Sequence, residues 1–432
     1  MKFTAAGDAI IQRRIFRDFT GYKELAPFIM QGDAAFFNLE TTLNYEGECC
    51  ASQFSGGTYI RTNPEVLEDM KRFGFNMTTF NNNHALDFSY AGLSHTLDAV
   101  KKSGLVHSGV GNNLAEAAAP RYLETANGRV ALISVNTSFA PSMMAGAQSP
   151  RVPGRPGING LRIQKHLELP KEDLDVIKRI ARETGINAEK EITRKEGYFP
   201  DLGNNEAELG ELRFTESDVP RFVMKIHEGD MNRVKSAIYE AKLQSDYILV
   251  SVHSHQLSGD AKENPADFLK EFAHRSIDAG ANAIIGHGPH LLRPIEIYKG
   301  SPIFYSLGDF VLQLYDIELA PEDFFAKHGL TSASTVHDLL KKRSKNFTTG
   351  LMTDRRMFLT VIPFWETEGT RLTSLKLMPV ELAMEGHHSE IGLPRRSKCP
   401  DEIAEYLADM CRPYGTRITL EEDGLLHITV PT

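Results

Sequence analysis

Short apolar runs that end in carboxylate, amide or imidazole side chains recur along this chain, and they constrain its fold more than any other feature. The runs end at Asp8, at Glu40, at Asn83 and His84, at His253 and His255, at His287 and His290, and at Asp309. In layered α/β proteins, ligands bind outside the carboxyl ends of the strands. The pattern therefore predicts a single cleft in which these polar groups collect.

Amphipathic stretches separate the apolar runs. Residues 3–7, 34–38, 76–80 and 130–135 have the composition of strands, whereas 64–73 and 90–102 carry apolar residues at helical spacing. The alternation resumes with a helical pattern at 231–242 and strand-like runs at 247–252 and 283–285. Strands alternating with helices indicate an α/β fold built on a mixed or parallel sheet.

The length of 432 residues exceeds what one simple core usually organises. Composition shifts at about 139–225 and again at about 316–354, where the chain becomes more polar. We expect a core domain over 1–382 that these two insertions interrupt, followed by a small α/β extension over 383–432.

Charge and cysteine content exclude several classes of protein. The formal net charge of −9 argues against a nucleic-acid partner, which needs a basic surface. Four cysteines at irregular spacing fit neither a disulfide framework nor a zinc-binding Cys pair. No secretion signal or membrane-spanning run is recognisable, so we expect a cytoplasmic protein. Its oligomeric state stays open.

The mixture of polar groups at the strand ends points to a metal. Each residue alone is more often a turn residue, a helix cap or an ordinary histidine. Together they offer imidazole, carboxylate and amide donors without a thiolate, a set that suits a divalent transition metal such as Mn, Zn or Fe better than Ca or Mg. The string GHGPH, which ends at His290, adds two imidazoles across a sharp turn. We expect one or two ions.

Several strings resemble the CapA family of capsule and poly-γ-glutamate biosynthesis proteins, a branch of the calcineurin-like metallophosphoesterase superfamily. The strings are GDAIIQR (7–13), NLE (38–40), NNHALDF (82–88), VSVHSH (250–255), GHGPHLLRPIEIYKGSPIFYSLGDF (286–310) and LKLMPVEL (375–382). The resemblance implies a four-layer α/β/β/α sandwich with inserted segments and a C-terminal extension.

The resemblance also implies metal ligands. Asp8 and His290 would bind a first ion and Glu40 would bridge, while a second ion would take Asn83, His253 and His287. Two departures stand out. Ile10 replaces a histidine that is usual in the superfamily, which favours a single ion, and Ser254 and His255 replace a Trp-Gly pair.

Catalytic and supporting roles follow from the same resemblance. His84 matches the histidine that protonates the leaving group, and Asp87 would orient it. His290 could also serve as an acid or base. Arg13 would meet an anionic substrate or form a structural ion pair, while His255 and Asp309 would be supporting groups.

Three functions remain open at this level. The first is a hydrolase that acts on a phosphoester or related bond in capsule or poly-γ-glutamate metabolism. The second is a cytoplasmic peptide epimerase of the lasso-peptide type, which inverts a Cα centre by acid–base catalysis with His290 or His84 opposite Asp8. The third is a non-catalytic subunit of a polymer synthase. The substrate is accordingly anionic or a peptide.

Overall fold

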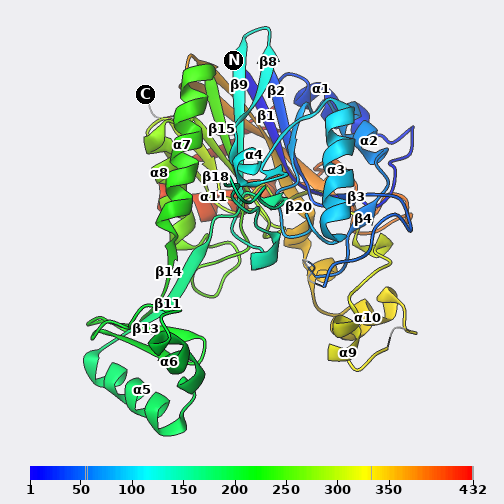
Figure 1. The fold of residues 1–432 in the computed structure, drawn as a ribbon. Helices are drawn as coiled ribbons and strands as arrows, with labels where there is room; N and C mark the ends of the chain where they lie inside the picture. The colour runs from blue at the N-terminus through cyan, green and yellow to red at the C-terminus, as the bar shows by residue number, and fades with distance from the viewer. Residues whose placement is uncertain (54, 56, 332, 431–432) are drawn as a thin grey trace. The chain divides into compact units, whose positions relative to one another are not determined.

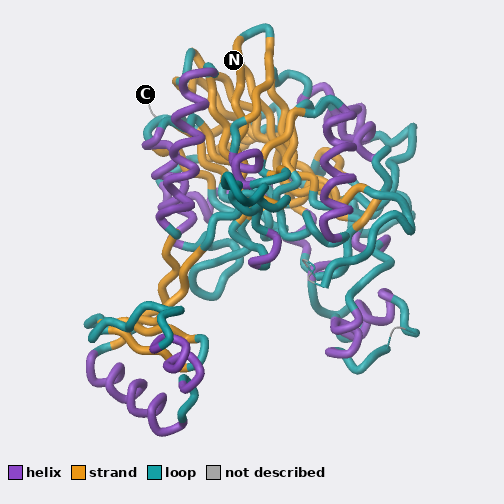
Figure 2. The backbone as a smooth tube through the Cα atoms, in the orientation of Figure 1, coloured by secondary structure: helices purple, strands orange, loops and turns teal. Residues whose placement is uncertain are grey.

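The structure is a computed structural model that describes residues 1–53, 55, 57–331 and 333–430. The chain forms two compact units, one made of Met1–Leu161 with the chain from Asp230 onward, the other of Arg162–Gly229. The first unit is a mixed α/β structure with several sheets, which confirms the predicted fold class at this level. Figure 2 shows its strands gathered between helices.

A large mixed sheet forms the centre of the first unit. β1 runs parallel to β2 and β19 and antiparallel to β20. Among the described residues its strands are β1 (Lys2–Ile10), β2 (Ala34–Leu39), β5 (Met77–Thr79), β6 (Val106–Ser108), β19 (Asp309–Leu312), β20 (Leu359–Glu368), β21 (Arg371–Leu382), β22 (Pro394–Arg396), β23 (Ile418–Leu420) and β24 (Leu426–Ile428).

A second sheet packs on the large one. Its strands, in spatial order, are β17 (Ile295–Tyr298), β18 (Ser301–Phe304), β16 (Ala283–His287), β15 (Tyr247–His253), β9 (Gly128–Asn136) and β8 (Arg121–Thr125). Phe3 of the large sheet stacks on Tyr247 of the second at 4.1 Å between ring centroids. Trp365 donates from its indole N–H to the hydroxyl of Tyr247 at 3.1 Å. The apolar core between the sheets therefore aligns the ends of their strands.

Helices cover the outer faces of both sheets (Figure 1). α1 (Gly21–Ile29), α2 (Val66–Phe73) and α3 (Ser89–Ser103) lie on the side of the large sheet, and α7 (Glu228–Gln244) and α8 (Asp267–Ala279) lie on the side of the second. The apolar face of α3 carries Leu93, Leu97 and Val100 into the core, at the helical spacing seen in the sequence.

The C-terminal residues contribute to the large sheet. α11 (Pro400–Cys411) buries Ile403 and Leu407 in the core between the sheets. β24 then pairs with β21, and β23 pairs with β24 as a hairpin.

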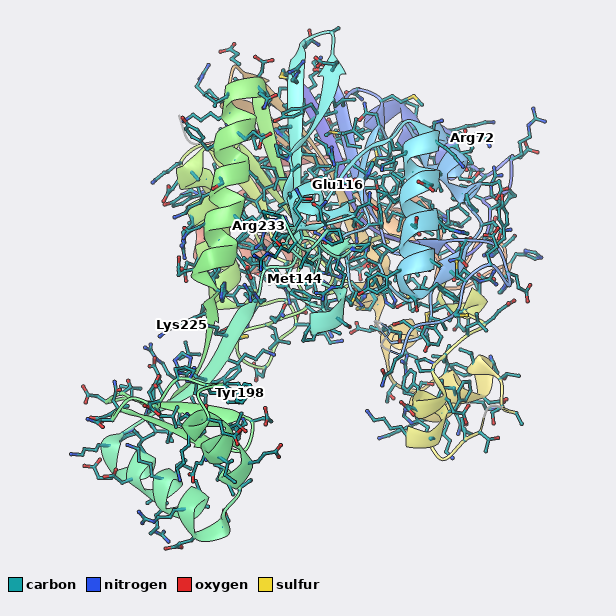
Figure 3. The ribbon with its side chains drawn as sticks, viewed as in Figure 1. Arg72, Glu116, Met144, Tyr198, Lys225 and Arg233 are labelled. Carbon is teal, nitrogen blue, oxygen red and sulfur yellow. The ribbon has the colours of Figure 1, made fainter. Side chains whose placement is uncertain are left out.

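Residues that lead to the second unit are held by the first. β10 (Gly157–Ile158) pairs with β7 (Val110–Gly111), next to α4 (Leu114–Ala118). Arg233 of α7 (Figure 3) donates to Oδ1 of Asn159 at 3.0 Å and to the carbonyl of Gly160 at 2.5 Å. These bonds anchor the chain just before it enters the second unit.

The second unit is a small α/β module. Its strands are β11 (Ile163–Leu169), β12 (Glu206–Leu209), β13 (Leu212–Glu216) and β14 (Arg221–Ile226), and its helices are α5 (Lys171–Thr184) and α6 (Ala188–Lys195). Leu174 and Phe214 form its core with Ala207. The acidic stretch at 204–216, weakly periodic in sequence, is the β12–β13 hairpin.

Residues 316–354 are part of the first unit and pack against the rest of it through a separate apolar cluster. This segment contains α9 (Glu322–Lys327) and α10 (Val336–Arg343). Leu339 of α10 and Phe325 of α9 are buried with Ile10 and Ile60, which come from the edge of the cleft. None of the helices that the structure describes has both the length and the apolar character needed to cross a bilayer.

Candidate metal centre

Asp8 is placed where three parallel strands meet. β1 pairs Asp8 with Asn38 of β2 and with Asp309 of β19, and the register shifts next to Asp8 in both ladders. A Cβ on Gly7 would lie 1.8 Å from the carbonyl oxygen of Gly308, so only glycine permits this close approach. The irregularity turns the Asp8 carboxylate toward the cleft, as bulges near functional sites commonly do.

Two hydrogen bonds hold the buried carboxylate of Asp8. Asn38 donates its Nδ2 to Oδ1 at 2.7 Å, and the backbone N–H of Gly288 donates to Oδ2 at 2.8 Å. Gly288 has a φ of 116°, a conformation that favours glycine. The turn after β16 therefore positions Asp8 as well as its own histidines.

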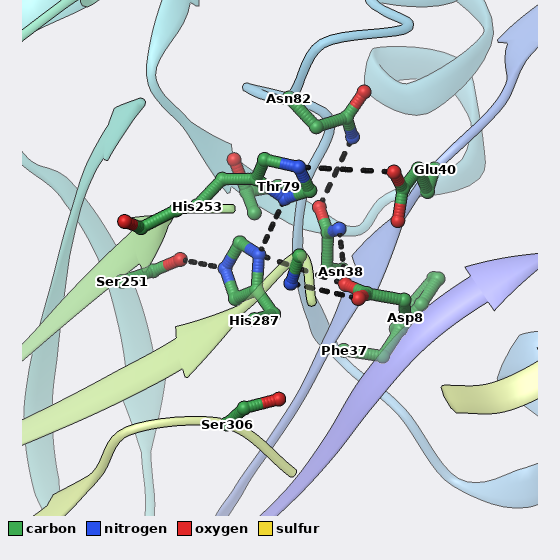
Figure 4. A network of polar contacts seen from close by, with 12 residues as sticks. Asp8, Phe37, Asn38, Glu40, Thr79, Asn82, Ser251, His253, His287 and Ser306 are labelled. Atoms are coloured by element: carbon green, nitrogen blue, oxygen red, sulfur yellow. Dashed lines mark hydrogen bonds and ion pairs between the residues drawn. The ribbon is translucent and has the colours of Figure 1, made fainter. Parts of the chain in front are cut away.

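Three histidines from neighbouring strand ends face one another. Nδ1 of His253 lies 3.0 Å from Nδ1 of His287, and Nε2 of His253 lies 3.0 Å from Nε2 of His255. Ser251 contacts Nε2 of His287 at 2.6 Å, which leaves Nδ1 of that ring directed at the cluster (Figure 4). Side chains at 251 and 253 share one face of β15 because strand residues alternate, and His255 follows just after the strand ends.

Glu40 and Asn83 complete this side of the cluster. Asn83 Oδ1 lies 2.7 Å from Nε2 of His253 and 3.2 Å from Nε2 of His255. Glu40 is fully buried, yet neither of its carboxylate oxygens accepts a hydrogen bond from a described residue. A buried carboxylate without hydrogen bonds is costly unless a cation neutralises it.

His290 and Asp309 form the opposite side. Nδ1 of His290 lies 2.9 Å from Oδ1 of Asp309 and 3.8 Å from Oδ2 of Asp8. His290 has a φ of 60°, in the left-handed region where residues other than glycine are strained. Oδ2 of Asp309 is buried and also lacks a hydrogen-bond partner among the described residues.

The spacing of these atoms fits ligands around a cation. Two atoms that each bind one ion at about 2.0–2.2 Å lie no more than about 4.3 Å apart. Nδ1 of His287 lies 3.6 Å from Oδ1 of Asp8, and Nε2 of His253 lies 3.7 Å from Oε1 of Glu40 (Figure 4). Both distances are too long for hydrogen bonds and are of the size expected between two ligands.

Three groups of described residues could each hold an ion, and the groups share members. In each group one donor atom per residue lies within 4.8 Å of the others; the groups are Asp8 with His253 and His287, Glu40 with His253 and His255, and Asp8 with His290 and Asp309. The residues present therefore fit one or two divalent cations. His255 and Asp309, expected as supporting groups, stand within ligand distance.

Burial opposes charge on the carboxylates. It raises the pKa of Asp8 to about 7, against the lowering effect of His290. Burial also raises the pKa of Glu40 well above its ordinary range, and the charge of Asp8 adds to this. Without a cation the cluster therefore holds protons that a cation would displace.

Burial keeps most of the imidazoles neutral. It lowers the pKa of His287 to about 3 and that of His253 well below the ordinary range. His290 differs: burial lowers its pKa, but Asp309 and Glu40 outweigh burial and raise the value to about 10. Neutral imidazole is the form that binds metals.

His84 and Asp87 form a hydrogen-bonded pair beside the cluster. Nδ1 of His84 lies 2.6 Å from Oδ2 of Asp87, and the backbone N–H of Ile60 donates to the same oxygen at 2.9 Å. Since a carboxylate only accepts, Nδ1 carries the proton and Nε2 is left for the cleft. His84 lines that cleft together with Asn83, His255 and His290.

Arg13 lies outside the cluster. Its guanidinium donates to Oδ2 of Asp316 at 3.0 Å and to the carbonyls of Ser389 at 2.9 Å and His388 at 2.6 Å. These contacts match the structural ion pair that the sequence left open, and a role toward an anionic substrate stays a prediction.

Residues 2–314 match the family profile described as bacterial capsule synthesis protein PGA_cap. The chain belongs to this family. It is the CapA family that the strings of the sequence resemble, and the candidate ligands from Asp8 to Asp309 all lie within the matched range.

Three relatives illustrate the similarity. The uncharacterized protein y4sH of Sinorhizobium fredii (strain NBRC 101917 / NGR234) is 31% identical over 441 residues, which cover 98% of this chain and 92% of that protein. The PGA biosynthesis protein CapA of Bacillus subtilis (strain 168) is 24% identical over 67% of this chain and 56% of its own length. A probable polyglutamine synthesis accessory protein of Mycobacterium tuberculosis is 23% identical over 98% of this chain and 90% of its own length.

Three supporting residues of this PGA_cap member escaped the sequence analysis. Asn38 and Ser251 hold Asp8 and His287, and Asn82 donates to Oδ1 of Asn38 at 3.1 Å. For Asn38 and Ser251 the available signal was a polar residue two positions before a predicted ligand, since residues two apart share one face of a strand.

Proposed function

We propose that this protein is a metal-dependent hydrolase with one or two divalent ions, of Mn, Zn or Fe, bound at the rim of a four-layer α/β/β/α sandwich. The observation that carries the proposal is the Glu40 carboxylate, fully buried without a hydrogen bond, with the imidazole of His253 3.7 Å away. His290, whose raised pKa keeps it charged, lies 4.0 Å from Glu40 without a hydrogen bond, and a cation would bind the carboxylate directly.

The proposed ligands are Asp8, Glu40, Asn83, His253, His287 and His290, joined by His255 and Asp309. A bound ion of this kind supplies a Lewis acid and lowers the pKa of bound water toward neutrality. The protein's own contribution is to hold the donors in place. Ser251 and Asn38 do this through the hydrogen bonds described above, since supporting bonds of this type fix ligand orientation.

His84 is the proposed general acid. Its Nδ1–H bond to Asp87 fixes the ring, so that in the imidazolium form, with both nitrogens protonated, Nε2 can give its proton to the leaving oxygen and leave the neutral ring hydrogen-bonded to Asp87. Asp87 is itself held by the N–H of Ile60, and it therefore positions the imidazole rather than meeting the substrate. The family description, bacterial capsule synthesis protein, and the Bacillus subtilis relative, a PGA biosynthesis protein, support a substrate from capsule or poly-γ-glutamate metabolism.

A peptide epimerase is the second candidate, because two imidazole–carboxylate pairs border one cleft. His84 with Asp87 and His290 with Asp309 provide two separate acid–base groups. Inversion of a Cα centre needs one group to remove the proton and another to return it on the opposite face.

The test begins with metal analysis of the purified protein and hydrolysis of bis(p-nitrophenyl) phosphate and p-nitrophenyl phosphate. We expect His84→Ala to lower turnover by about 10²–10⁴-fold and to retain the metal. His95→Ala is the matched control, since His95 is an exposed histidine that contacts Glu48.

The outcomes separate the candidates. Hydrolysis equal in His84→Ala and His95→Ala would contradict the proposed general acid. No hydrolysis, with solvent deuterium entering Cα of a peptide, would replace the hydrolase by the epimerase. Bound metal with neither activity would leave a non-catalytic subunit of a polymer synthase.

A further inference from the structure

The cleft at the candidate metal centre continues into a cavity with an apolar wall. Asn83, His84, His255 and His290 border one end of the cavity. Leu340, Phe347 and Met352, from the segment that follows α10 and from α10 itself, line it elsewhere. Residues 336–353 lie after the end of the family match, which stops at 314.

The apolar side chains of this wall are only partly buried. Leu340, Phe347, Leu351 and Met352 are half-buried, whereas Leu339 behind them is fully buried in a small core. Ile10 and Ile60 line the cavity from the side of the sheets. An exposed apolar lining beside a polar centre is the arrangement of most small-molecule sites.

Arg343, the last residue of α10, supplies one positive charge to the same cavity. Within the described part of the chain no carboxylate lies within ion-pair distance of its guanidinium, whose carbon lies 5.7 Å from the ring centroid of Phe324. Lys342, next in sequence, does not line the cavity. A single guanidinium recognises one planar anionic group well.

A left-handed turn holds Phe347 in the wall. Lys345, Asn346 and Phe347 have φ values of 51°, 62° and 56°. The N–H of Phe347 donates to the hydroxyl of Ser344 at 2.9 Å, and the N–H of Asn346 donates to the carbonyl of Lys341 at 2.8 Å. Residues other than glycine are strained in this conformation, and such residues cluster at functional sites.

We propose that this cavity binds a substrate group of aromatic or bulky aliphatic size that carries one carboxylate. The apolar part packs against Phe347 and Leu340, the carboxylate pairs with Arg343, and the reacting bond lies toward His84 and His290. This inference rests on the proposed function for the location of the reacting bond. Of a polyanionic polymer only one terminal residue would enter this cavity, because one guanidinium neutralises one charge and the wall would desolvate the others.

The test measures binding to metal-free protein, so that the probe cannot ligate an ion. The probes are 2-naphthoate, 2-naphthamide, acetate and triglutamate, and calorimetry measures the binding affinity of each. We expect 2-naphthoate to bind more tightly than acetate or triglutamate. Arg343→Gln should lower the affinity for 2-naphthoate by about fivefold and leave the affinity for 2-naphthamide unchanged, since a half-exposed ion pair contributes about 1 kcal/mol or less. Lys342→Gln is the matched control.

The ring is tested separately from its backbone. Phe347→Gly should weaken both naphthyl probes, whereas Asn346→Gly relieves the same left-handed strain without changing the lining and should leave binding unchanged. Circular dichroism confirms that each variant is folded.

The inference would be overturned if Arg343→Gln and Lys342→Gln lost affinity for 2-naphthoate equally. It would also be overturned if Phe347→Gly and Asn346→Gly lost affinity equally, or if triglutamate bound more tightly than 2-naphthoate. Naphthoate binding of the expected kind in a protein that takes up no metal would instead refute the proposed function and leave the cavity assignment standing.

Discussion

Replacement of Asp8 by Asn should change stability in opposite directions with and without metal. Burial raises the pKa of Asp8 from 3.8 to about 7 in the metal-free protein. Between these values the folded chain keeps a proton that the unfolded chain has released, so stability falls as pH rises through this window. A difference of about 3 pKa units corresponds to roughly 4 kcal/mol at pH 7.5.

Asn cannot titrate, so Asp8→Asn removes this penalty. Part of the gain is lost, because Asp8 accepts bonds from Asn38 and Gly288 and an amide offers only one oxygen. A mismatched buried donor costs about 1–3 kcal/mol. We therefore expect metal-free Asp8→Asn to be about 1–3 kcal/mol more stable than wild type at pH 7.5. Near pH 4 we expect it to be less stable than wild type, because the titration penalty has almost vanished there and the cost of the mismatched donor remains.

With metal the order should reverse. Loss of a charged ligand should lower metal affinity by more than the ~10–100-fold typical of losing a supporting hydrogen bond. The assay is urea denaturation of Asp8→Asn and wild type at pH 7.5, in chelator and in excess Mn²⁺ or Zn²⁺, with exposed Asp260→Asn as control. A variant that is less stable than wild type in chelator, or equally stabilised by metal, would refute the reasoning.

Three further predictions concern the supports of the centre. Metal affinity should rise about tenfold per pH unit between pH 7 and 10, because His290, with a pKa of about 10, must lose its proton to bind an ion. Below pH 7 the affinity should rise more steeply with pH, because Asp8 also holds a proton there. A pH-independent affinity in chelator-buffered titrations would exclude His290 as a ligand. Gly7→Ala should lower both metal content and stability, since its Cβ would lie 1.8 Å from the carbonyl oxygen of Gly308; wild-type metal content would contradict this. Arg293→Met should destabilise the protein by several kcal/mol in urea denaturation, because this fully buried guanidinium donates to three carbonyls of the loop after β15; an unchanged midpoint would show that the loop finds other donors.

Local pattern was sufficient to predict several of the elements, and it marked the polar residues at their ends as candidate ligands. Apolar runs with β-like composition became β1, β2, β9, β15 and β16. Burial of alternating side chains leaves the residue at the carboxyl end of each strand open to the cleft, and that rule involves only neighbours in sequence. The limits of the inserted segments and the catalytic roles stay predictions.

Tertiary structure decided which polar groups meet. Asp309 reaches His290 and Asp8 only because β19 pairs with β1, some 300 residues away in sequence, through a register shift that local composition does not encode. Tertiary packing likewise brings Asp316 next to Arg13, so this arginine of a predicted functional string forms an ion pair with Asp316. The half-buried wall with Phe347 arises from a segment whose apolar residues look unremarkable in sequence, because partial burial is a property of packing between distant parts of the chain.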